Sequence, residues 1–418
     1  MRFPQAAVVP AAATPFRERL LLAVLYVTVL ASSIAFIEPS PHDGLMGLLA
    51  LACIVAGVHF ERRIVLFVML LLVFNISGLI ALLNVVGQEK TIQYTATSIY
   101  LAVAGILFAC LFAENTMSRL AAMRSAYVLT AVAVALAGIL GYFNAFPHAQ
   151  DLFASVGRAM GAFKDPNVFG PFLIWPTLIV MERMFVRRIS VIDLATVVIL
   201  LLGLLLSFSR GAWFHFAVSC AVMIALAFLT APDMRVRLRV FGFTVIAFAA
   251  LAGLIAIALS FSSIDAMFKE RFQLVQSYDV GQGGRFELQE LAVSEVLRNP
   301  IGMGPFEFSR VYGLQQHNVY LQAFLVYGWL GGVSYILMLL TTFYVALRSV
   351  FVATPWQPYV ITALAAFTGE VLEGAVIDSD HWRHFYLLLG TIWGLYAATA
   401  KFRGRQYAPG GPFAYVRA

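Results

Sequence analysis

Charged residues are scarce in this chain. They make up 12% of its 418 residues, whereas hydrophobic residues make up 61% and the mean hydropathy is +0.85. A soluble globule of this length needs far more polar surface than such a composition supplies. The shortage of charge therefore excludes a soluble protein and indicates a polytopic membrane protein.

Cysteine is also rare, and its three positions, Cys53, Cys110 and Cys220, all fall within apolar stretches. They form neither a disulfide framework nor a metal motif of the CxxC type. The sequence also lacks segments that interleave Lys and Arg with aromatic residues, so we expect no nucleic-acid partner. The net charge of +6 instead suits the anionic headgroups of membrane lipids.

Internal repeats, low-complexity linkers and room for a separate soluble domain are missing too. The lone Gly302-x-Gly304 has no Walker or Rossmann context, so it predicts a turn rather than a nucleotide loop. We therefore expect a single membrane domain over residues 1–418. Its last segment, residues 402–418, is expected to form a cytoplasmic tail that is disordered around Pro409-Gly410-Gly411-Pro412.

Twelve apolar stretches are long enough to cross a bilayer, which takes roughly 20 residues per helix. They predict an all-α fold of about twelve transmembrane helices. The first stretch follows a long tail and is expected to be an uncleaved anchor rather than a signal peptide. The approximate limits are 19–37, 44–60, 63–85, 91–113, 121–143, 166–182, 189–208, 212–230, 239–261, 318–348, 357–377 and 384–401.

The positions of the cations predict the orientation, because Lys and Arg accumulate in cytoplasmic loops. With the N-terminus inside, most of the 28 Lys and Arg residues fall in the inner segments, and the short outer links are nearly free of them. Both termini are then cytoplasmic. Arg210, Arg285, His317 and Asp380 are expected on the outer side.

The longest polar interruption is residues 262–316, between the ninth and tenth apolar stretches. We expect a long periplasmic loop that contains short helices. Gly281, Gly283 and Gly284 precede Arg285, and the residues from there to Leu297 have the pattern of an amphipathic helix. Arg285 would then add its charge to a helix N-terminus that already favours anions, unless the helix simply lies on the membrane surface.

Two further candidates lie on the same expected face. Arg210 sits in the tight link Ser207–Trp213, where its guanidinium can make bidentate contacts with phosphate or snorkel to lipid headgroups. His317 begins the tenth stretch and can accept or orient a hydroxyl proton, bind a pyrophosphate in its charged form, or serve as an ordinary interfacial residue.

The eleventh and sixth stretches supply more polar candidates. Glu370 and Glu373 are three residues apart, share a helix face, and can pair with Arg210 or Arg285 or provide a base. Asp378 and Asp380 can hold a divalent cation or form a self-satisfied polar turn. At the start of the sixth stretch, Asp165 before Pro166 predicts a helix N-cap, and Lys164 and Asn167 place further polar groups at the outer interface.

Taken in order, these motifs resemble the O-antigen ligase and polymerase superfamily. The resemblance covers roughly residues 155–335 by motif and the whole chain by topology. The motifs are Lys164-Asp165-Pro166-Asn167, Ser209-Arg210-Gly211-Ala212-Trp213, Gly283-Gly284-Arg285, Asn299-Pro300 with Gly302-x-Gly304, His317-Asn318-x-Tyr320 and Gly328-x-x-Gly331.

The resemblance implies a glycosyltransferase of the GT-C type in the bacterial inner membrane. Its donor would be a polyprenyl-pyrophosphate-linked glycan, and its acceptor a sugar hydroxyl of lipid A-core in a ligase or of another lipid-linked glycan in a polymerase. By motif, Arg210 and Arg285 would hold the pyrophosphate and His317 would activate or place the acceptor, with inversion and with neither metal nor cofactor. Lys164, Asn167, Asn318, Glu370 and Glu373 are expected to bind substrate; for the two glutamates this expectation comes from the residues alone.

The ligase is favoured over an O-antigen or exopolysaccharide polymerase, and a transporter or flippase for lipid-linked sugars is the competing class. Carriers usually show inverted repeats and broken helices at the membrane midplane. Here the polar residues gather at one face instead. A purely structural anchor would leave the costly Arg210, Glu370 and Glu373 unexplained.

Overall fold

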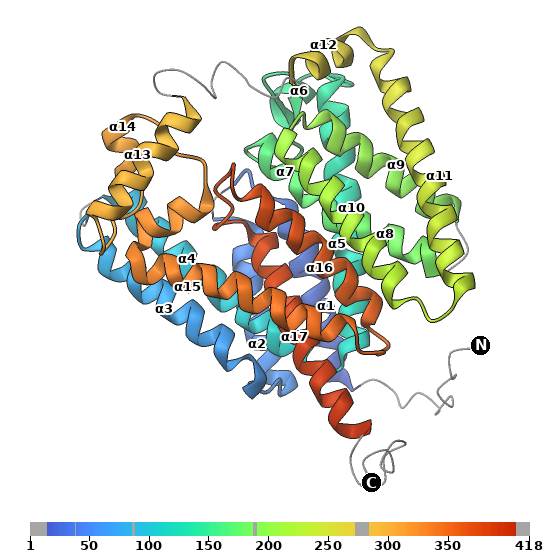
Figure 1. The fold of residues 1–418 in the computed structure, drawn as a ribbon, viewed down its shortest axis with the longest axis horizontal. Coiled ribbons are helices and arrows are strands. Elements are labelled where there is room, and N and C mark those ends of the chain that lie inside the picture. Colours follow the sequence, from blue (N-terminus) through green and yellow to red (C-terminus); the bar gives the residue numbers. More distant parts are fainter. Residues whose placement is uncertain (1–14, 38, 86–87, 187–189, 272–283, 407–418) are drawn as a thin grey trace.

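The computed structural model describes residues 15–37, 39–85, 88–186, 190–271 and 284–406. In these ranges the regular secondary structure is helical apart from one small antiparallel hairpin (Figure 1). The elements are α1 (Phe16–Leu30), η1 (Ala31–Ser33), α2 (Pro41–Ala56), η2 (Arg62–Ile64), α3 (Val65–Leu82), α4 (Glu89–Phe112), α5 (Thr116–Tyr142), α6 (Ala149–Phe153), β1 (Ala154–Ser155), β2 (Arg158–Ala159), α7 (Pro166–Phe172), α8 (Ile174–Val186), α9 (Val191–Leu206), α10 (Arg210–Thr230), α11 (Met234–Leu259), α12 (Ser262–Arg271), α13 (Arg285–Arg298), α14 (Glu307–Tyr312), α15 (Val319–Val350), α16 (Gln357–Glu373) and α17 (Arg383–Gln406).

The helices account for every apolar stretch predicted from the sequence, with residues 166–182 divided between α7 and α8. An all-α membrane architecture is therefore confirmed, whereas the number of twelve crossings stays a prediction. Within the described ranges, seven helical segments are long and apolar enough to cross a membrane, and α2 and α9 are shorter apolar helices. The seven are Arg62–Leu82, Glu89–Phe112, Thr116–Tyr142, Pro166–Phe185, Arg210–Thr230, Met234–Leu259 and Val319–Val350.

Small residues bring the central helices close together. Gly390 on α17 lies so near α4 that a Cβ there would be 2.6 Å from the carbonyl oxygen of Gly105. Gly369 on α16 has the same role against α10, because a Cβ at this position would collide with the His215 ring. Such contacts replace the hydrophobic driving force that lipid does not supply. They fix α10 against α16, the two helices that carry much of the polar site described below.

The segment after α13 docks into a break in α15. Gly328 has φ 68° and ψ −175°, a conformation essentially restricted to glycine. The break leaves two main-chain groups of α15 without their helical hydrogen-bond partners, and the docked segment supplies new partners. Met303 donates its N–H to the Leu325 carbonyl (2.6 Å), and Trp329 donates its N–H to the Pro300 carbonyl (2.9 Å). Through these bonds α15 holds the end of α13 in place.

The local predictions around the long polar segment are largely confirmed. The predicted helix after Gly284 is α13, and it ends at Arg298 with Asn299 as its C-cap, as the Asn-Pro pair indicates. The helices α12 and α14 are also short, and Gly281 and Gly283 lie outside the described residues. Near the C-terminus, helical structure extends through Gln406 and so reaches into the segment expected as a tail.

Candidate functional site

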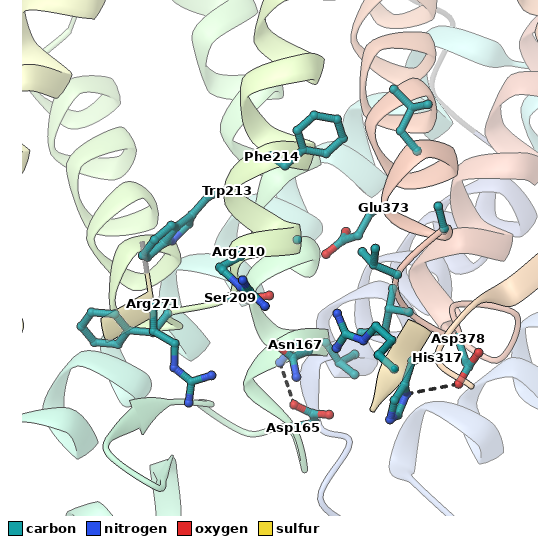
Figure 2. Close-up of a pocket in the computed structure, with 18 of the residues that line it drawn as sticks. Asp165, Asn167, Ser209, Arg210, Trp213, Phe214, Arg271, His317, Glu373 and Asp378 are labelled. Carbon is teal, nitrogen blue, oxygen red and sulfur yellow. Dashed lines mark hydrogen bonds and ion pairs between the residues drawn. The ribbon is translucent and has the colours of Figure 1, made fainter. Parts of the chain in front are cut away.

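A polar cavity of about 1260 Å³ lies among the ends of several helices (Figure 2). Its wall is built from the first residues of α7, α10 and α13, His317 two residues before α15, the last turn of α16 and the loop after it. Arg271 at the end of α12 and Arg158 in β2 complete the wall. Segments from residue 158 to residue 382 therefore contribute to one site.

Most of the predicted site residues meet at this cavity. Arg210, Arg285, His317, Asn167 and Glu373 all line it. Lys164 lines a smaller neighbouring cavity of about 160 Å³. Asn318 and Glu370 line neither cavity; Asn318 caps α15, and Glu370 is buried behind the wall.

Three helices, α10, α13 and α15, begin at or next to the cavity wall. Ser209 caps α10 by accepting a hydrogen bond from the Ala212 N–H (3.4 Å), and Asn318 caps α15 by accepting from the N–H groups of Tyr320 and Leu321 (3.0 and 3.1 Å). Arg210 and Arg285 are the first residues of α10 and α13. Helix N-termini carry partial positive charge, so the dipoles and the guanidinium groups both favour an anion here.

Two more arginines reach the same cavity, and sequence reasoning did not single them out as site residues. Arg158 donates from Nε to the Ser207 carbonyl (2.8 Å) and from Nη2 to Asn167 Oδ1 (2.7 Å). Arg271 lies on the α12 side of the cavity, beside Trp213 (Figure 2). The one feature that distinguished them in the sequence was a positive charge in a predicted outer loop, where Lys and Arg are usually scarce.

His317 has a carboxylate partner that the sequence did not assign to it. Its Nδ1 lies 3.5 Å from Oδ2 of Asp378, and its backbone has φ 48°, which is uncommon for a residue other than glycine. Burial raises the pKa of the Asp378 carboxyl, although the hydrogen bond from His317 opposes that shift. The side chain of His317 is half exposed, so it can meet a substrate while Asp378 orients the ring from behind.

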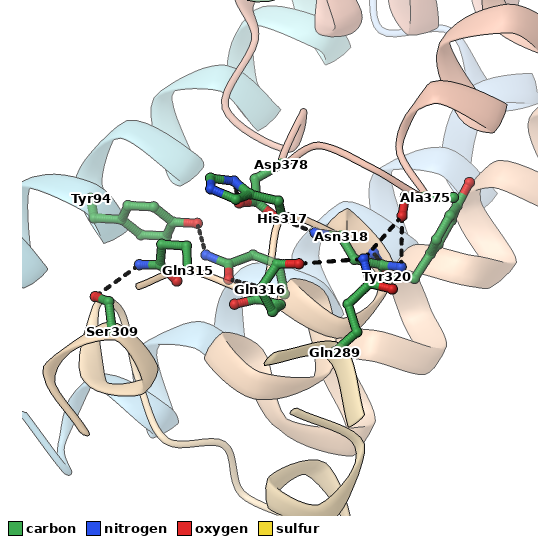
Figure 3. Close-up of polar contacts among 11 residues, drawn as sticks. Tyr94, Gln289, Ser309, Gln315, Gln316, His317, Asn318, Tyr320, Ala375 and Asp378 are labelled. Atoms are coloured by element: carbon green, nitrogen blue, oxygen red, sulfur yellow. Dashed lines mark hydrogen bonds and ion pairs between the residues drawn. The ribbon is translucent and has the colours of Figure 1, made fainter. Parts of the chain in front are cut away.

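The backbone around His317 is fixed by polar contacts on both sides (Figure 3). Gln316 is fully buried and donates to Gln322 Oε1 (2.6 Å), which in turn donates from Nε2 to the Tyr94 hydroxyl (3.2 Å). On the other side, Asn318 donates its main-chain N–H to Asp378 Oδ1 and its amide to the Ala375 carbonyl (both 3.0 Å). Strained backbone at functional sites persists only where its surroundings hold it in this way.

Asp378 and Asp380, which the sequence suggested as ligands of one divalent cation, have different hydrogen-bond partners. Asp380 accepts hydrogen bonds from the Tyr94 hydroxyl (2.7 Å) and His381 Nδ1 (2.9 Å), whereas Asp378 faces His317 and Asn318. Among the residues that the structure describes, no three His, Cys, Asp or Glu side chains are grouped as metal ligands would be.

The two glutamates of α16 have histidine partners. Oε2 of Glu373 lies 2.8 Å from Nδ1 of His215, and Oε1 of Glu370 lies 3.6 Å from Nε2 of His384. The sequence had suggested Arg210 or Arg285 for these carboxylates. His215 is distant from both glutamates in the sequence, so only the packing of α10 on α16 identifies it as the partner of Glu373.

The N-cap predicted before the sixth apolar stretch is confirmed. Asp165 accepts a hydrogen bond from the Asn167 N–H (2.8 Å), and Pro166 occupies the first position of α7. This cap turns the Asn167 side chain towards Arg158 at the cavity wall. Asp165 itself also lines the cavity.

Comparison with known families matches residues 195–336 to the family described as O-antigen ligase. The matched range includes Arg210, Arg285 and His317, which the structure brings to one cavity. The resemblance inferred from the motifs is therefore confirmed. No curated protein matches the chain.

Proposed function

Because residues 195–336 match the family described as O-antigen ligase, we propose that the protein is a membrane glycosyltransferase of the GT-C type. It transfers a glycan from a polyprenyl-pyrophosphate donor to a sugar hydroxyl on the periplasmic side of the bacterial inner membrane. As an O-antigen ligase, it uses lipid A-core as the acceptor.

The observation that carries this proposal is the convergence of cationic groups and a histidine on one cavity. Arg210 and Arg285 line it at the N-terminal ends of α10 and α13, and His317 lines it with Asp378 behind the ring. This arrangement supports a site with an anion on one side and a hydroxyl group on the other. Asn167 belongs to the same wall and can contribute a polar contact to the substrate.

In the proposed reaction, the acceptor oxygen attacks the anomeric carbon of the donor glycan. The hydroxyl O–H bond breaks, and His317 accepts the proton while Asp378 stabilises the ring in its charged form. The new C–O bond forms as the bond from the anomeric carbon to the pyrophosphate oxygen breaks, with inversion at the carbon. Negative charge grows on the leaving pyrophosphate, where Arg210 and Arg285 stabilise it.

A polymerase of the same superfamily is the second candidate, and one feature of the cavity favours it. Arg158 and Arg271 add two guanidinium groups beyond the Arg210 and Arg285 pair. A polymerase joins two lipid-linked glycans, so it has a second pyrophosphate to accommodate. The two extra guanidinium groups suit that demand.

Reconstitution into vesicles tests the proposal. The purified protein is given a lipid-linked glycan donor with either lipid A-core or additional donor as acceptor, and the products are separated by size. One extended lipid A-core product is expected for the ligase, and a ladder of lipid-linked glycans indicates the polymerase. Movement of donor across the bilayer with no new glycosidic bond would contradict the glycosyltransferase and indicate a transporter.

A further inference from the structure

A buried histidine behind the cavity lies between two hydrogen-bond acceptors. Nε2 of His215 is 3.0 Å from the main-chain carbonyl of Ala366, and Nδ1 is 2.8 Å from Oε2 of Glu373. The side chains of His215 and Glu373 are 2% and 1% exposed. The proposed transfer reaction gives no role to this pair.

The geometry fixes the number of protons that the pair holds. A carbonyl oxygen can only accept, so Nε2 carries a hydrogen. The contact between Nδ1 and Oε2 then contains one more proton, which belongs either to an imidazolium beside a carboxylate or to a neutral imidazole beside a carboxylic acid. The pair has zero net charge in both forms, and they differ only in the atom that carries this proton.

Glu373 also reaches the cavity where an anion is expected. It lines the cavity wall, and a Cβ built on Gly211 would lie 2.7 Å from its Oε1. Figure 2 shows the Glu373 carboxyl directed from α16 towards the first turn of α10, next to Arg210. A phosphate bound at this helix end would therefore meet the carboxyl at close range. Two negative charges so near each other in a poorly hydrated site repel strongly.

We propose that His215 and Glu373 form a proton-transfer couple that responds to anion binding in the cavity, an inference that rests on the proposed pyrophosphate site. Without an anion, the proton is on Nδ1 of His215 and Glu373 is a carboxylate. When pyrophosphate oxygens occupy the first turn of α10, the Nδ1–H bond breaks and an O–H bond forms on Glu373. Glu373 is then neutral, and no proton is taken from solvent.

Other charged and titratable groups surround the couple and take part in setting the balance. Glu370 lies one turn earlier on α16, and His384 on α17 contacts Glu370. The N-terminal residue of α10 is Arg210, and His317 and Asp378 share the cavity. Their charges do not change in the proposed step, which moves a single proton between His215 and Glu373.

The couple predicts how pyrophosphate affinity depends on pH in three variants. In His215→Asn the amide keeps a donor near Glu373 but has no proton to give up, so the proton that neutralises Glu373 when the anion binds must come from solvent. We expect its affinity for inorganic pyrophosphate to fall about tenfold from pH 6 to pH 8, relative to the wild type. Glu373→Gln carries the neutral form permanently and should bind at least as tightly as the wild type at both pH values.

The double variant His215→Asn/Glu373→Gln separates this role from simple packing. If the couple acts through charge, removing the carboxylate restores the affinity that His215→Asn loses. Titration calorimetry on the full-length protein in detergent measures the four affinities, and thermal unfolding checks that each variant folds. Equal affinity of His215→Asn and the wild type at pH 8, or a double variant no better than His215→Asn, would overturn the proposal.

Infrared difference spectroscopy tests the proton transfer in the wild type, whether or not the variants fold. Addition of pyrophosphate should produce the C=O stretching band of a carboxylic acid, and Glu373→Gln should lack that band. If pyrophosphate binds to the wild type without producing the band, the couple is wrong but the proposed donor site stands. If pyrophosphate does not bind to the wild type at all, the donor site and the couple both fail.

Discussion

At the scale of single residues, shape matters as much as charge. Arg210 sits at the first position of α10, beside the buried Glu373 carboxyl and within the cavity wall. A guanidinium presents a planar fork that matches two phosphate oxygens, whereas an ammonium is a point charge on a flexible stem. The position therefore favours arginine for recognising a pyrophosphate.

Arg210→Lys retains the charge but loses the fork. We expect the rate constant for glycan transfer to fall about 100-fold, because a preorganised contact to the developing charge is lost. Turnover of a lipid-linked donor by the purified variant measures this, with membrane insertion checked in parallel. Arg298→Lys is the matched control, since Arg298 is an exposed residue of α13 that does not line the cavity and forms an ion pair with its helix neighbour Glu295. Transfer at the wild-type rate by Arg210→Lys would exclude the pyrophosphate role.

The pairing of His317 with Asp378 predicts a pH dependence. Because burial raises the pKa of Asp378, its charged form is lost at a higher pH than for an ordinary aspartate as the medium is acidified. The neutral acid no longer stabilises a charged imidazole, so activity should decline on the acidic side. Asp378→Asn should be slow even at about pH 8 and should lack this part of the acidic decline.

Profiles of kcat/KM from about pH 5 to about pH 9 compare the wild type with Asp378→Asn and His317→Ala. His317→Ala is expected to be the least active of the three, because it loses the group that accepts the proton. Full activity of His317→Ala across the profile would rule out His317 as the acceptor-activating residue. An unchanged profile in Asp378→Asn would instead leave His317 in place and remove Asp378 from the mechanism.

At the scale of elements, the site depends on a break in one helix. Gly328 interrupts α15, and the segment 300–303 bonds to the main-chain groups at the break. Since that segment follows α13 directly, the break anchors the helix that begins with Arg285. A residue outside the cavity wall thereby helps to place one of the cationic groups of the cavity.

Gly328→Ala tests this anchoring. A Cβ at position 328 would collide with the main chain of Ile301, and the φ of 68° with ψ of −175° is strained for any other residue. We expect a loss of stability of about 1–3 kcal/mol or more, together with reduced transfer. Thermal unfolding in detergent measures the first effect. Gly253→Ala on α11 is the control, because no atom lies within 4 Å of a Cβ there and alanine favours a helix.

At the scale of the whole molecule, the cavity lies at the opposite end of α10 from a group of cations. The helix runs 21 residues from Arg210 to Thr230, and Arg235, Arg237 and Arg239 follow at the start of α11. Lys and Arg accumulate on the cytoplasmic side of membrane proteins. The cavity is therefore expected to open towards the periplasm.

Labelling of single cysteines tests this orientation. The three native cysteines are buried, so an added cysteine should dominate the reaction. A membrane-impermeant maleimide should label Glu290→Cys on α13 in intact cells with a permeable outer membrane, because Glu290 is exposed. It should label Arg403→Cys near the end of α17 only after the inner membrane is opened. The reverse pattern would place the site in the cytoplasm.

The sequence by itself determined the membrane character, the positions of the helices and the main cationic candidates. Hydropathy and helix capping are local properties, so a run of apolar residues or the Asp165-Pro166 pair carries its structure within a few neighbours. The motif order likewise indicated Arg210, Arg285 and His317 before their cavity was known. These residues are far apart in the chain, so the sequence predicted only that they lie on the same side of the membrane.

Only the tertiary structure decided which side chains meet. His215 pairs with Glu373 because glycine at position 369 lets α10 and α16 approach, and Asp378 faces His317 because the loop after α16 passes the start of α15. Arg158 reaches Asn167 through a hairpin that no local pattern predicted. The His215 and His317 contacts depend on helix packing over long sequence separations, which neither periodicity nor composition encodes.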